Sequence, residues 1–584
     1  MTTPAELAEH FAPTPDGEDK RLPLAEAVRR FVEPGMHLHL AYCGARPNAA
    51  VAEVVRAFHG TSPGFTVSAH GLVNSQLALL ADGLVSRLIA AYVGENYPAP
   101  APNPVFQRAL AEGGVELENW SLWTLTARLM AAGLGLPGMP VRSLVGSGMA
   151  DEHRGERFTE TAPFGDGPSS GVVAPLRPDV VLLQGAAADP NGNVVMPAPY
   201  GEGAWGALAA NVGVIACVEH VVSVEELRAQ NAAVRIPAHL VRAVCHTPFG
   251  SHPYGLYDAV AADRRRYAED VAFVRQVRDA SRQPEAFTDW MDEWVLKPGD
   301  HEGYLQQLGE GRLTSLVGRG RGDSWQFEGP SLRTAADPAT TEERMVLATS
   351  RLLGERIRRD GHDAVLAGIG LAHLAAWMAV RAANRDGVDV RLLTELGMLG
   401  YDPRPGDPYL FANRNLPTCR QLTDVTDVLG AYVSGPATRC LGVLGAGQID
   451  GNGDINSTWT ADGTFLTGSG GANDVASGAD DVVVTIRHSP RRLVDVVPYI
   501  TAPGVNVSAI VTSQAVLERR DGKFVLTGLL EPLGDDREAA LAAITDGIGF
   551  DVEVVADPVT QPAPDPDELA VLRSFDRDGV FLGV

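Results

Sequence analysis

Long apolar runs and cysteines are scarce in this chain of 584 residues. No run of eighteen apolar residues occurs, and residues 1–11 are polar and acidic, without the basic region and apolar core of a signal peptide. The five cysteines are widely spread and form no CxxC pair: Cys43, Cys217, Cys245, Cys419 and Cys440. We therefore expect reduced thiols, no membrane contact and a cytoplasmic location.

Positive charge is also in short supply, since 48 Lys and Arg face 73 Asp and Glu and the formal net charge is −25. Binding of nucleic acid needs a basic footprint, which the short Arg clusters do not supply. Anionic membranes are disfavoured for the same reason, but a few arginines and backbone amides can still bind a small anion such as a CoA ester. With 45% hydrophobic residues, 63 Gly and 40 Pro, the composition is that of a globular protein with many tight turns.

Several signatures of metal and cofactor chemistry are missing. The sequence has no HExxH, GxSxG or P-loop motif. Residues 450–454 resemble the start of a calcium loop, but Ile455 replaces the required glycine and Ala461 the closing glutamate. Residues 445–451 carry glycines at the wrong spacing for a dinucleotide-binding fingerprint. The sequence therefore predicts no metal site and no tightly bound cofactor.

The chain does contain a regular alternation of short apolar strands and amphipathic helices. From about residue 28 to residue 240 this alternation is typical of a parallel α/β sheet, and it resumes at Glu342 after a stretch without periodicity. We predict two similar open α/β domains with mostly parallel sheets, residues 1–317 and 342–584, joined by a linker of residues 318–341. Strands are expected at residues 36–40, 65–68, 87–92, 180–184, 214–218, 364–367, 391–394 and 464–466. Helices are expected at residues 49–58, 122–132, 253–294 and 372–383.

The two halves contain similar short segments in the same order, which indicates a distant internal repeat. Residues 87–91 (RLIAA) correspond to residues 391–395 (RLLTE), and the turn at residues 188–194 corresponds to the one at residues 448–456. In this register Ala91 occupies the position of Glu395. The repeat thus predicts two copies of one scaffold with a single acid between them.

Glu395 is the candidate catalytic residue. An acid at the end of a strand is more often solvated or a helix cap, but an ionised carboxylate is also a competent nucleophile toward an activated acyl group. We expect Gly397 to leave room for a substrate. In the same half, residues 468–474 (GSGGAND) can turn backbone N–H groups toward an oxyanion. Asn48 opens a helix after the first strand, where it either caps the helix or donates to an oxyanion.

The chain also resembles the family I CoA-transferases, in particular glutaconate CoA-transferase with its α and β subunits fused. The first half carries YGE at 200–202, VEHVV at 218–222, RIPA at 235–238, PFGSHP at 248–253 and WMDEW at 290–294. The second half carries ELG at 395–397, GGAND at 470–474, HSPRRL at 488–493 and YITAPG at 499–504. The chain departs from the family pattern where Ala45 and Arg46 interrupt a glycine-rich stretch and where Leu396 follows the glutamate.

The resemblance implies a ping-pong transfer of coenzyme A between an acyl-CoA and a carboxylic acid, through a glutamyl-CoA thioester on Glu395. It implies CoA as a substrate and a homodimer. The oxyanion and acyl group would be bound by Asn48, Gly470, Gly471 and Ala472. The groups beside CoA and substrate would be Gly44, Gly397, Gly400 and Asn473. Two alternatives stay open: a hydrolase of thioesters or C–C bonds with Glu395 as general base, and a non-enzymic scaffold in which Glu395 is dispensable.

Overall fold

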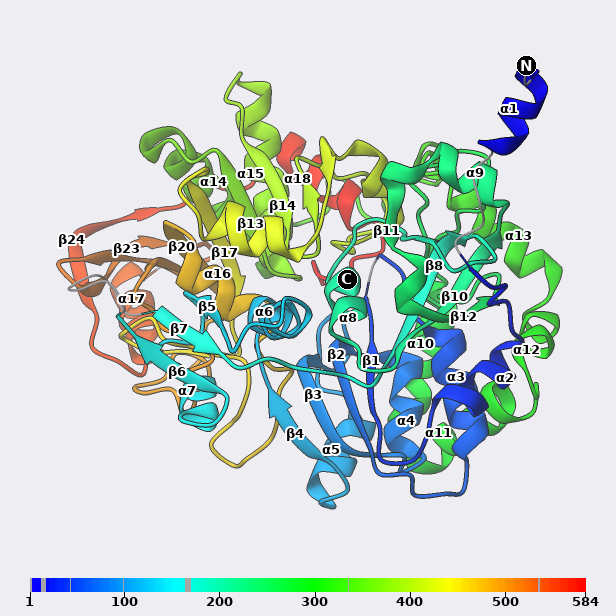
Figure 1. Ribbon diagram of the computed structural model, residues 1–584. Coiled ribbons are helices and arrows are strands. Elements are labelled where there is room, and N and C mark those ends of the chain that lie inside the picture. Colours follow the sequence, from blue (N-terminus) through cyan, green and yellow to red (C-terminus); the bar gives the residue numbers. More distant parts are fainter. Residues whose placement is uncertain are drawn as a thin grey trace.

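The computed structural model describes residues 3–11, 17–42, 44–97, 99–162, 170–334, 336–533 and 536–583. Two large sheets organise the chain, one built from strands between β1 and β12 and the other from strands between β13 and β24 (Figure 1). No helix within these ranges combines the length and the apolar character needed to cross a membrane. Cys217, Cys245, Cys419 and Cys440 are free thiols, and Cys43 lies outside the described residues.

The first sheet is parallel through seven strands in the order β12-β10-β8-β1-β2-β3-β4. Their bounds are β1 His37–Leu40, β2 Phe65–Leu72, β3 Val85–Val93, β4 Glu116–Asn119, β8 Val180–Ala188, β10 Gly213–Val221 and β12 Val241–His246. All nine residues of β8 are buried, as expected for a strand covered on both faces. Helix α3 (Asn48–Phe58) crosses from β1 to β2 and buries Val51, Val54 and Val55.

The second sheet has a parallel centre in the order β21-β20-β17-β13-β14. These strands are β13 Ala364–Ala367, β14 Arg391–Thr394, β17 Cys440–Gly445, β20 Asp481–Ile486 and β21 Val507–Thr512. Antiparallel strands extend this sheet on both sides. Beyond β14 lie β15 (Met398–Leu399) and β16 (Gln421–Leu422), and beyond β21 lie β22 (Ala515–Arg520) and β23 (Lys523–Leu529). Helix α15 (Leu371–Arg385) crosses from β13 to β14. Two separate α/β sheets, mostly parallel, are therefore present, as the sequence predicts.

Strand order defines the internal repeat and corrects its register. In both halves five parallel strands follow the same chain order and the same spatial order, so β1, β2, β8, β10 and β12 match β13, β14, β17, β20 and β21. The pairing of the fourth with the fifth strand shifts by one residue at the same place, after Val214 and after Val482. We then match residues from these shift points across each pair of neighbouring strands in the two sheets. This match makes His70 the counterpart of Glu395. The match of Ala91 with Glu395 is wrong, because Ala91 lies on β3, and the second sheet has an antiparallel strand there.

The repeated turns, by contrast, match in both sequence and structure. Asp189 Oδ1 accepts hydrogen bonds from the N–H groups of Gly192 and Asn193 at 2.9 and 3.0 Å. In the second half Asp450 Oδ1 accepts from Asn452 and Asp454 at 2.9 and 3.1 Å. Both turns follow the third strand of the repeat, so a short aspartate turn was a sound repeat signal.

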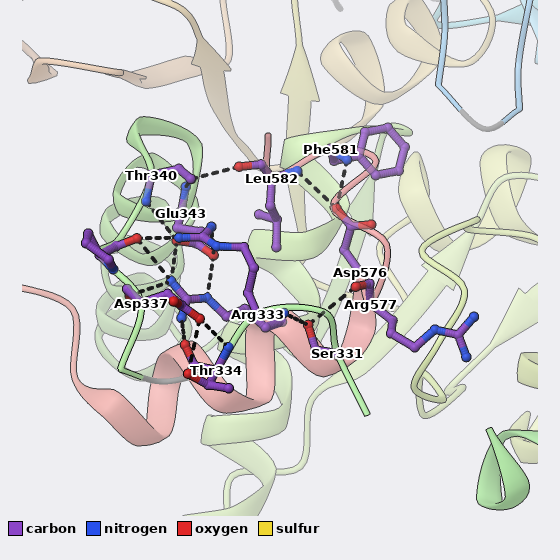
Figure 2. Close-up of polar contacts among 12 residues, drawn as sticks. Ser331, Arg333, Thr334, Asp337, Thr340, Glu343, Asp576, Arg577, Phe581 and Leu582 are labelled. Atoms are coloured by element: carbon purple, nitrogen blue, oxygen red, sulfur yellow. Dashed lines mark hydrogen bonds and ion pairs between the residues drawn. The ribbon is translucent and has the colours of Figure 1, made fainter. Parts of the chain in front are cut away.

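The chain that joins the two sheets is tied to the C-terminal helix α18 (Pro566–Phe575) (Figure 2). Glu343, in the first turn of α14 (Thr341–Asp360), is fully buried and accepts from Arg573 Nε and Nη2 at 2.7 and 2.9 Å. Arg333 Nη1 donates to the same carboxylate at 3.0 Å, and Thr340 Oγ1 donates to Leu582 O at 2.7 Å. Residues within the predicted linker are thereby held against the second sheet's helices. The boundaries at 317 and 342 stay predictions, and α13 (Glu310–Arg319) crosses the first of them.

Two expected elements are wrong. Residues 253–270 are irregular, and the helices begin only at α10 (Val271–Ser281), where Asp270 accepts the N–H of Phe273 as an N-cap. Residues 464–466 form no strand, because a turn at Thr460 returns the chain so that only Phe465 pairs, in an isolated bridge with Trp459.

Candidate active site

Glu395 follows the last residue of β14, at the carboxyl edge of the parallel strands, where open α/β sheets bind their ligands. Its turn is fixed on both sides, since Gly397 N–H donates to Thr394 O at 3.1 Å and Gly201 N–H donates to Leu396 O at 3.2 Å. The residue keeps partial solvent exposure, but Oε2 is buried and accepts no hydrogen bond from any described residue. No described residue therefore occupies the lone pairs of this oxygen.

The surroundings of Glu395 favour its neutral form more than water does. Burial raises the pKa of the Glu395 carboxyl to about 7, against the opposing effects of a backbone N–H and of the charge on His70. The charge of Asp474 acts in the same direction as burial. Burial also raises the pKa of Asp474 to about 6, although Ser121 Oγ and the N–H of Trp123 donate to it at 2.6 and 3.0 Å. Near neutral pH, small changes around Glu395 therefore shift its ionisation.

The glycine loop before α16 (Ala472–Gly478) lies against Glu395. A Cβ added to Gly471 would meet Glu395 Cβ and Cγ at 3.7 Å, an ordinary contact distance. The N–H of Gly470 donates to Ala91 O at 2.9 Å and that of Ala472 to Ser469 O at 2.9 Å. The Gly471 N–H has no acceptor in the described part of the chain. Of the three amides expected at an oxyanion site, only that of Gly471 is free to donate.

This loop belongs to the second half by sequence but is anchored on the first. Val93 N–H donates to Thr467 O at 3.0 Å, and Leu122 N–H donates to Gly470 O at 3.0 Å. Asp474 completes the anchor, because its two oxygens bind the start of α6 (Leu122–Gly133). The first half thus forms the support under the loop, and the second half supplies both the loop and the acid.

Three glycines expected beside a ligand instead lie against other parts of the protein. A Cβ on Gly44 would lie 2.2 Å from Ala198 O, and one on Gly397 would lie 2.0 Å from Thr423 O. Both glycines also have positive φ, +63° and +121°. At Gly400 a Cβ would lie 2.8 Å from the Arg420 side chain. The space at Gly397 is therefore filled by protein, and the expectation that it leaves room for a substrate is wrong.

The two asparagines are held in hydrogen bonds. Asn473 is fully buried, donates from Nδ2 to Thr501 O at 2.9 Å and accepts the N–H of Leu144 at 2.8 Å. Asn48 donates from Nδ2 to Ser251 O and His252 O at 2.9 and 3.2 Å. A donor role for Asn48 at an oxyanion stays a prediction, and it requires the amide to leave these two carbonyls.

A chain of buried polar groups, which the sequence analysis did not identify, lies beneath the site. The fully buried Glu202 has Oε2 at 2.9 Å from His70 Nδ1 and Oε1 at 3.5 Å from His39 Nε2. Glu202 also accepts the N–H of Tyr42 at 2.9 Å. On its other side, His70 Nε2 lies 2.9 Å from Thr126 Oγ1. The signal for this group was the alternation of histidines along neighbouring strands, which places their side chains on one face.

His70 lies between Thr126 and Glu202. Thr126 Oγ1 donates to Leu122 O at 2.9 Å, so it accepts from His70 Nε2, and Nδ1 faces the Glu202 carboxylate. Burial alone would raise the pKa of Glu202, but the charge of His70 and the proximity of both histidines bring it below the ordinary value. The charge of His70 also lowers the pKa of Glu395.

A metal ion has one geometrically possible site within the described ranges, at Asp360, His362 and Asp481. Arg356 contacts Asp481 at 2.7 Å and Arg359 contacts Asp360 at 2.6 Å, so arginines already balance both carboxylates. The cluster is an ion-pair network, and we assign no metal to it.

Comparison with known proteins agrees with this arrangement. Residues 22–247 match the family described as Coenzyme A transferase. The chain is 28% identical over 324 residues to one of the two subunits of glutaconate CoA-transferase from Acidaminococcus fermentans, in a match that covers 51% of this chain and 94% of that subunit. It is 27% identical over 170 residues to the other subunit of the same enzyme, in a match that covers 25% of this chain and 61% of that subunit.

Among solved structures, the fold resembles that of the acyl-CoA transferase YdiF from E. coli O157:H7, in a thioester complex with CoA. The TM-score is 0.65 at 15% identity, and the match covers 98% of each chain. Residues 22–247 thus form a coenzyme A transferase region, the chain is an enzyme, and one polypeptide holds the parts similar to both glutaconate CoA-transferase subunits.

Proposed function

We propose that the chain transfers coenzyme A between an acyl-CoA and a carboxylic acid, and that Glu395 carries the CoA between the two half-reactions. The observation that supports this most directly is the Glu395 carboxyl, whose Oε2 accepts no hydrogen bond from the described residues. A carboxylate oxygen with a free lone pair is a competent nucleophile toward a thioester carbonyl.

The proposed reaction balances without any further reagent. Glu395 attacks the acyl-CoA carbonyl, the C–S bond breaks, and an acyl-glutamyl anhydride and CoA thiolate form. The thiolate then attacks the glutamyl carbonyl and releases the acyl group as a carboxylate, which leaves the glutamyl-CoA thioester. An incoming carboxylate repeats these two steps in reverse order, leaves as the new acyl-CoA and restores Glu395.

The groups around Glu395 fit these reaction steps. The free N–H of Gly471 is the described donor best placed to stabilise negative charge on a carbonyl oxygen near Glu395. The positive charge on His70 helps keep Glu395 ionised for the first attack. Coenzyme A enters as a substrate, and these steps use no tightly bound cofactor. A homodimer and a cytoplasmic location stay predictions.

A second candidate is a hydrolase in which Glu395 activates water. The observation that favours it is the pKa of about 7, which suits a general base at neutral pH. In this reaction the acyl-CoA is consumed with water, and no CoA is attached to the protein at any stage.

The two candidates differ in the covalent state of Glu395. Wild-type protein incubated with an acyl-CoA should gain the mass of CoA, and hydroxylamine should convert Glu395 to its hydroxamate, which peptide mass spectrometry locates. The Glu395→Gln and Glu395→Ala variants should show neither product and should lose turnover by at least about 1,000-fold, the size expected when a nucleophile is removed.

Glu219 offers a matched control within the chain. Burial raises its pKa to about 7 as well, but the N–H of Phe249 and the hydroxyl of Tyr267 bind its carboxylate at 2.9 and 3.0 Å. The Glu219→Gln variant should still form the adduct on Glu395. Full turnover in Glu395→Ala would overturn both candidates. If wild type turns over the acyl-CoA but forms no adduct and exchanges no label between CoA pools, the hydrolase is favoured.

A further inference from the structure

Glu202 is a fully buried carboxylate that the proposed reaction steps do not use. It directly precedes α8 (Gly203–Ala209), and its Oε1 accepts the N–H of Tyr42 at 2.9 Å. Its Oε2 lies 2.9 Å from Nδ1 of His70, near the end of β2. A buried ionic group adds little stability over apolar side chains of similar volume, because its desolvation is costly. A carboxylate in this place is therefore expected to do more than hold the fold together.

The loop that carries Glu202 reaches Glu395 through the backbone. The Gly201 N–H donates to the carbonyl of Leu396, the residue after Glu395, at 3.2 Å. On the other side of the loop, a Cβ on Gly201 would lie 2.1 Å from Tyr42 O, so no side chain fits between the loop and the first sheet. Glu202 binds the N–H of the same tyrosine. The loop is thus fixed between the first sheet and the Glu395 turn.

A second path to Glu395 runs through side chains and starts at the His70 ring. Its Nε2 lies 2.9 Å from Thr126 Oγ1, one turn into α6, and this hydroxyl donates to Leu122 O at 2.9 Å. At the start of α6, Leu122 Cδ1 lies 3.5 Å from the position of a Cβ on Gly471, and Glu395 Cβ lies 3.7 Å from the same position. Both paths therefore end at the residue with the reacting carboxyl.

His70 acts on carboxyl groups from three elements. Burial raises the pKa of Glu395, at the end of β14, and of Asp474, in α16, and the charge of His70 opposes this effect at both. Glu202 is the carboxylate in contact with the ring, and the other titratable group beside Glu202 is His39, whose Nε2 lies 3.5 Å from Oε1. A carboxylate beside an imidazole favours the charged ring. Glu202 is therefore well placed to keep charge on His70.

We propose that Glu202 is a positioning residue for Glu395. Through its loop it fixes the Glu395 turn against the first sheet, and through its contact with His70 it keeps the charge of that ring beside the reacting carboxyl. The proposal rests on the proposed function, because it needs Glu395 to be the nucleophile. It gives the first half of the chain, which lacks the nucleophile, a part in making the nucleophile reactive.

The Glu202→Gln variant tests the charge, because glutamine keeps the size of the side chain and an oxygen for the Tyr42 N–H. The acid limb of the kcat/KM profile should move up by about one pH unit, the effect of losing a neighbouring opposite charge, while the plateau at high pH changes by less than about threefold. Loss of the negative charge of Glu202 alone would move the limb down, so a move up requires His70 to lose charge as well. The double variant with His70→Gln should move the limb no further than His70→Gln alone, since both changes act through one charge.

The Glu202→Ala variant tests the position, because it removes the acceptor of the Tyr42 N–H that fixes the loop. Formation of the Glu395 adduct should slow by about 100-fold, with KM for the acyl-CoA changed by less than about threefold, because a displaced nucleophile reacts slowly with substrate that is still bound. Glu343→Gln is the matched control. Glu343 is also fully buried and paired with Arg573, so its replacement should lower stability but leave the acid limb and the rate of adduct formation unchanged.

An acid limb that stays or moves down in Glu202→Gln would overturn the proposal, and so would an equal shift in Glu343→Gln or a wild-type adduct rate in Glu202→Ala. Thermal unfolding establishes which variants are folded, and Glu202→Gln keeps the test available if Glu202→Ala is not. If wild type forms no adduct, the proposed function fails independently. Labelling of Glu395 by a water-soluble carbodiimide, which reacts with protonated carboxyls, then tests Glu202 by itself. Labelling that extends to higher pH in Glu202→Gln supports the assignment, and any other pattern overturns it.

Discussion

Replacing Glu395 with Gln should stabilise the folded protein at alkaline pH while it abolishes turnover. Burial raises the pKa of Glu395 from an ordinary value of 4.5 to about 7. A carboxyl whose pKa is higher in the folded state favours folding only while it is protonated there. The stability it contributes is therefore present below about pH 4.5 and is lost as the pH rises to about 7. Glutamine has the same shape and carries no charge at any of these pH values.

The size of the effect follows from the same two pKa values. A pKa difference of roughly 2.5 corresponds to about 3 kcal/mol at pH 8, and to less than about 1 kcal/mol at pH 5, where the folded protein still holds the proton. These figures are upper limits, because Glu395 keeps partial solvent exposure. With an unfolding entropy of about 2 cal/mol/K per residue, the gain at pH 8 raises Tm by about 3 °C if the whole chain unfolds together. It raises Tm by about 7 °C if the second half unfolds alone.

Thermal unfolding of wild type and Glu395→Gln at pH 5 and pH 8 measures this directly. Glu553 supplies the matched control, since it is an exposed glutamate in the same half and its replacement with Gln removes no buried charge. The prediction concerns the difference between the two pH values, so any cost of fitting an amide into the site cancels. A Tm change in Glu395→Gln that is the same at both pH values would refute the reasoning, and so would a decrease confined to pH 8.

Two further predictions concern the neighbours of Glu395. Because the charge on His70 lowers the pKa of Glu395, His70→Gln should move the acid limb of the kcat/KM profile to higher pH, and an unmoved limb with a lower plateau would indicate a structural role alone. Gly471→Ala should fold normally, because φ at this residue is −89°, but it should lower kcat/KM, because its Cβ meets Glu395 at 3.7 Å. Gly397→Ala should lower the free energy of unfolding by about 3 kcal/mol or more, because its Cβ would lie 2.0 Å from Thr423 O and φ there is positive. Circular dichroism melts and steady-state kinetics distinguish these two glycines, and a stable Gly397→Ala protein would contradict the packing argument.

Much of the fold was accessible from the sequence because its signals are local. Strands that are buried on both faces read as short apolar runs, and β13 begins and ends where the sequence predicts. The limits of the helical segment after residue 253 were not accessible in this way. Its start depends on the Asp270 cap, which competes with several equally plausible polar residues upstream.

The candidate site was predictable only where one residue carries the chemistry. Glu395 was identified because an acid at the end of an apolar strand conflicts with its surroundings. The glycines were harder to interpret, since a glycine required by a neighbouring backbone, such as Gly397, reads the same as one required by a ligand, as we propose for Gly471. Arg46 was noted as an interruption, and only the structure shows that its side chain is buried without a carboxylate.

The corrected register places different residues at one strand-end position of the repeated scaffold. The same strand-end position holds Glu395 in the second half and His70 in the first, and the charge of each acts on the site where the halves meet. Two carboxylates there would disfavour each other's ionisation, as Asp474 already does for Glu395. The charge of His70 has the opposite effect, since it lowers the pKa of Glu395 and so favours the ionised acid. Under the proposed function, the asymmetry between the copies therefore favours the ionised form of Glu395.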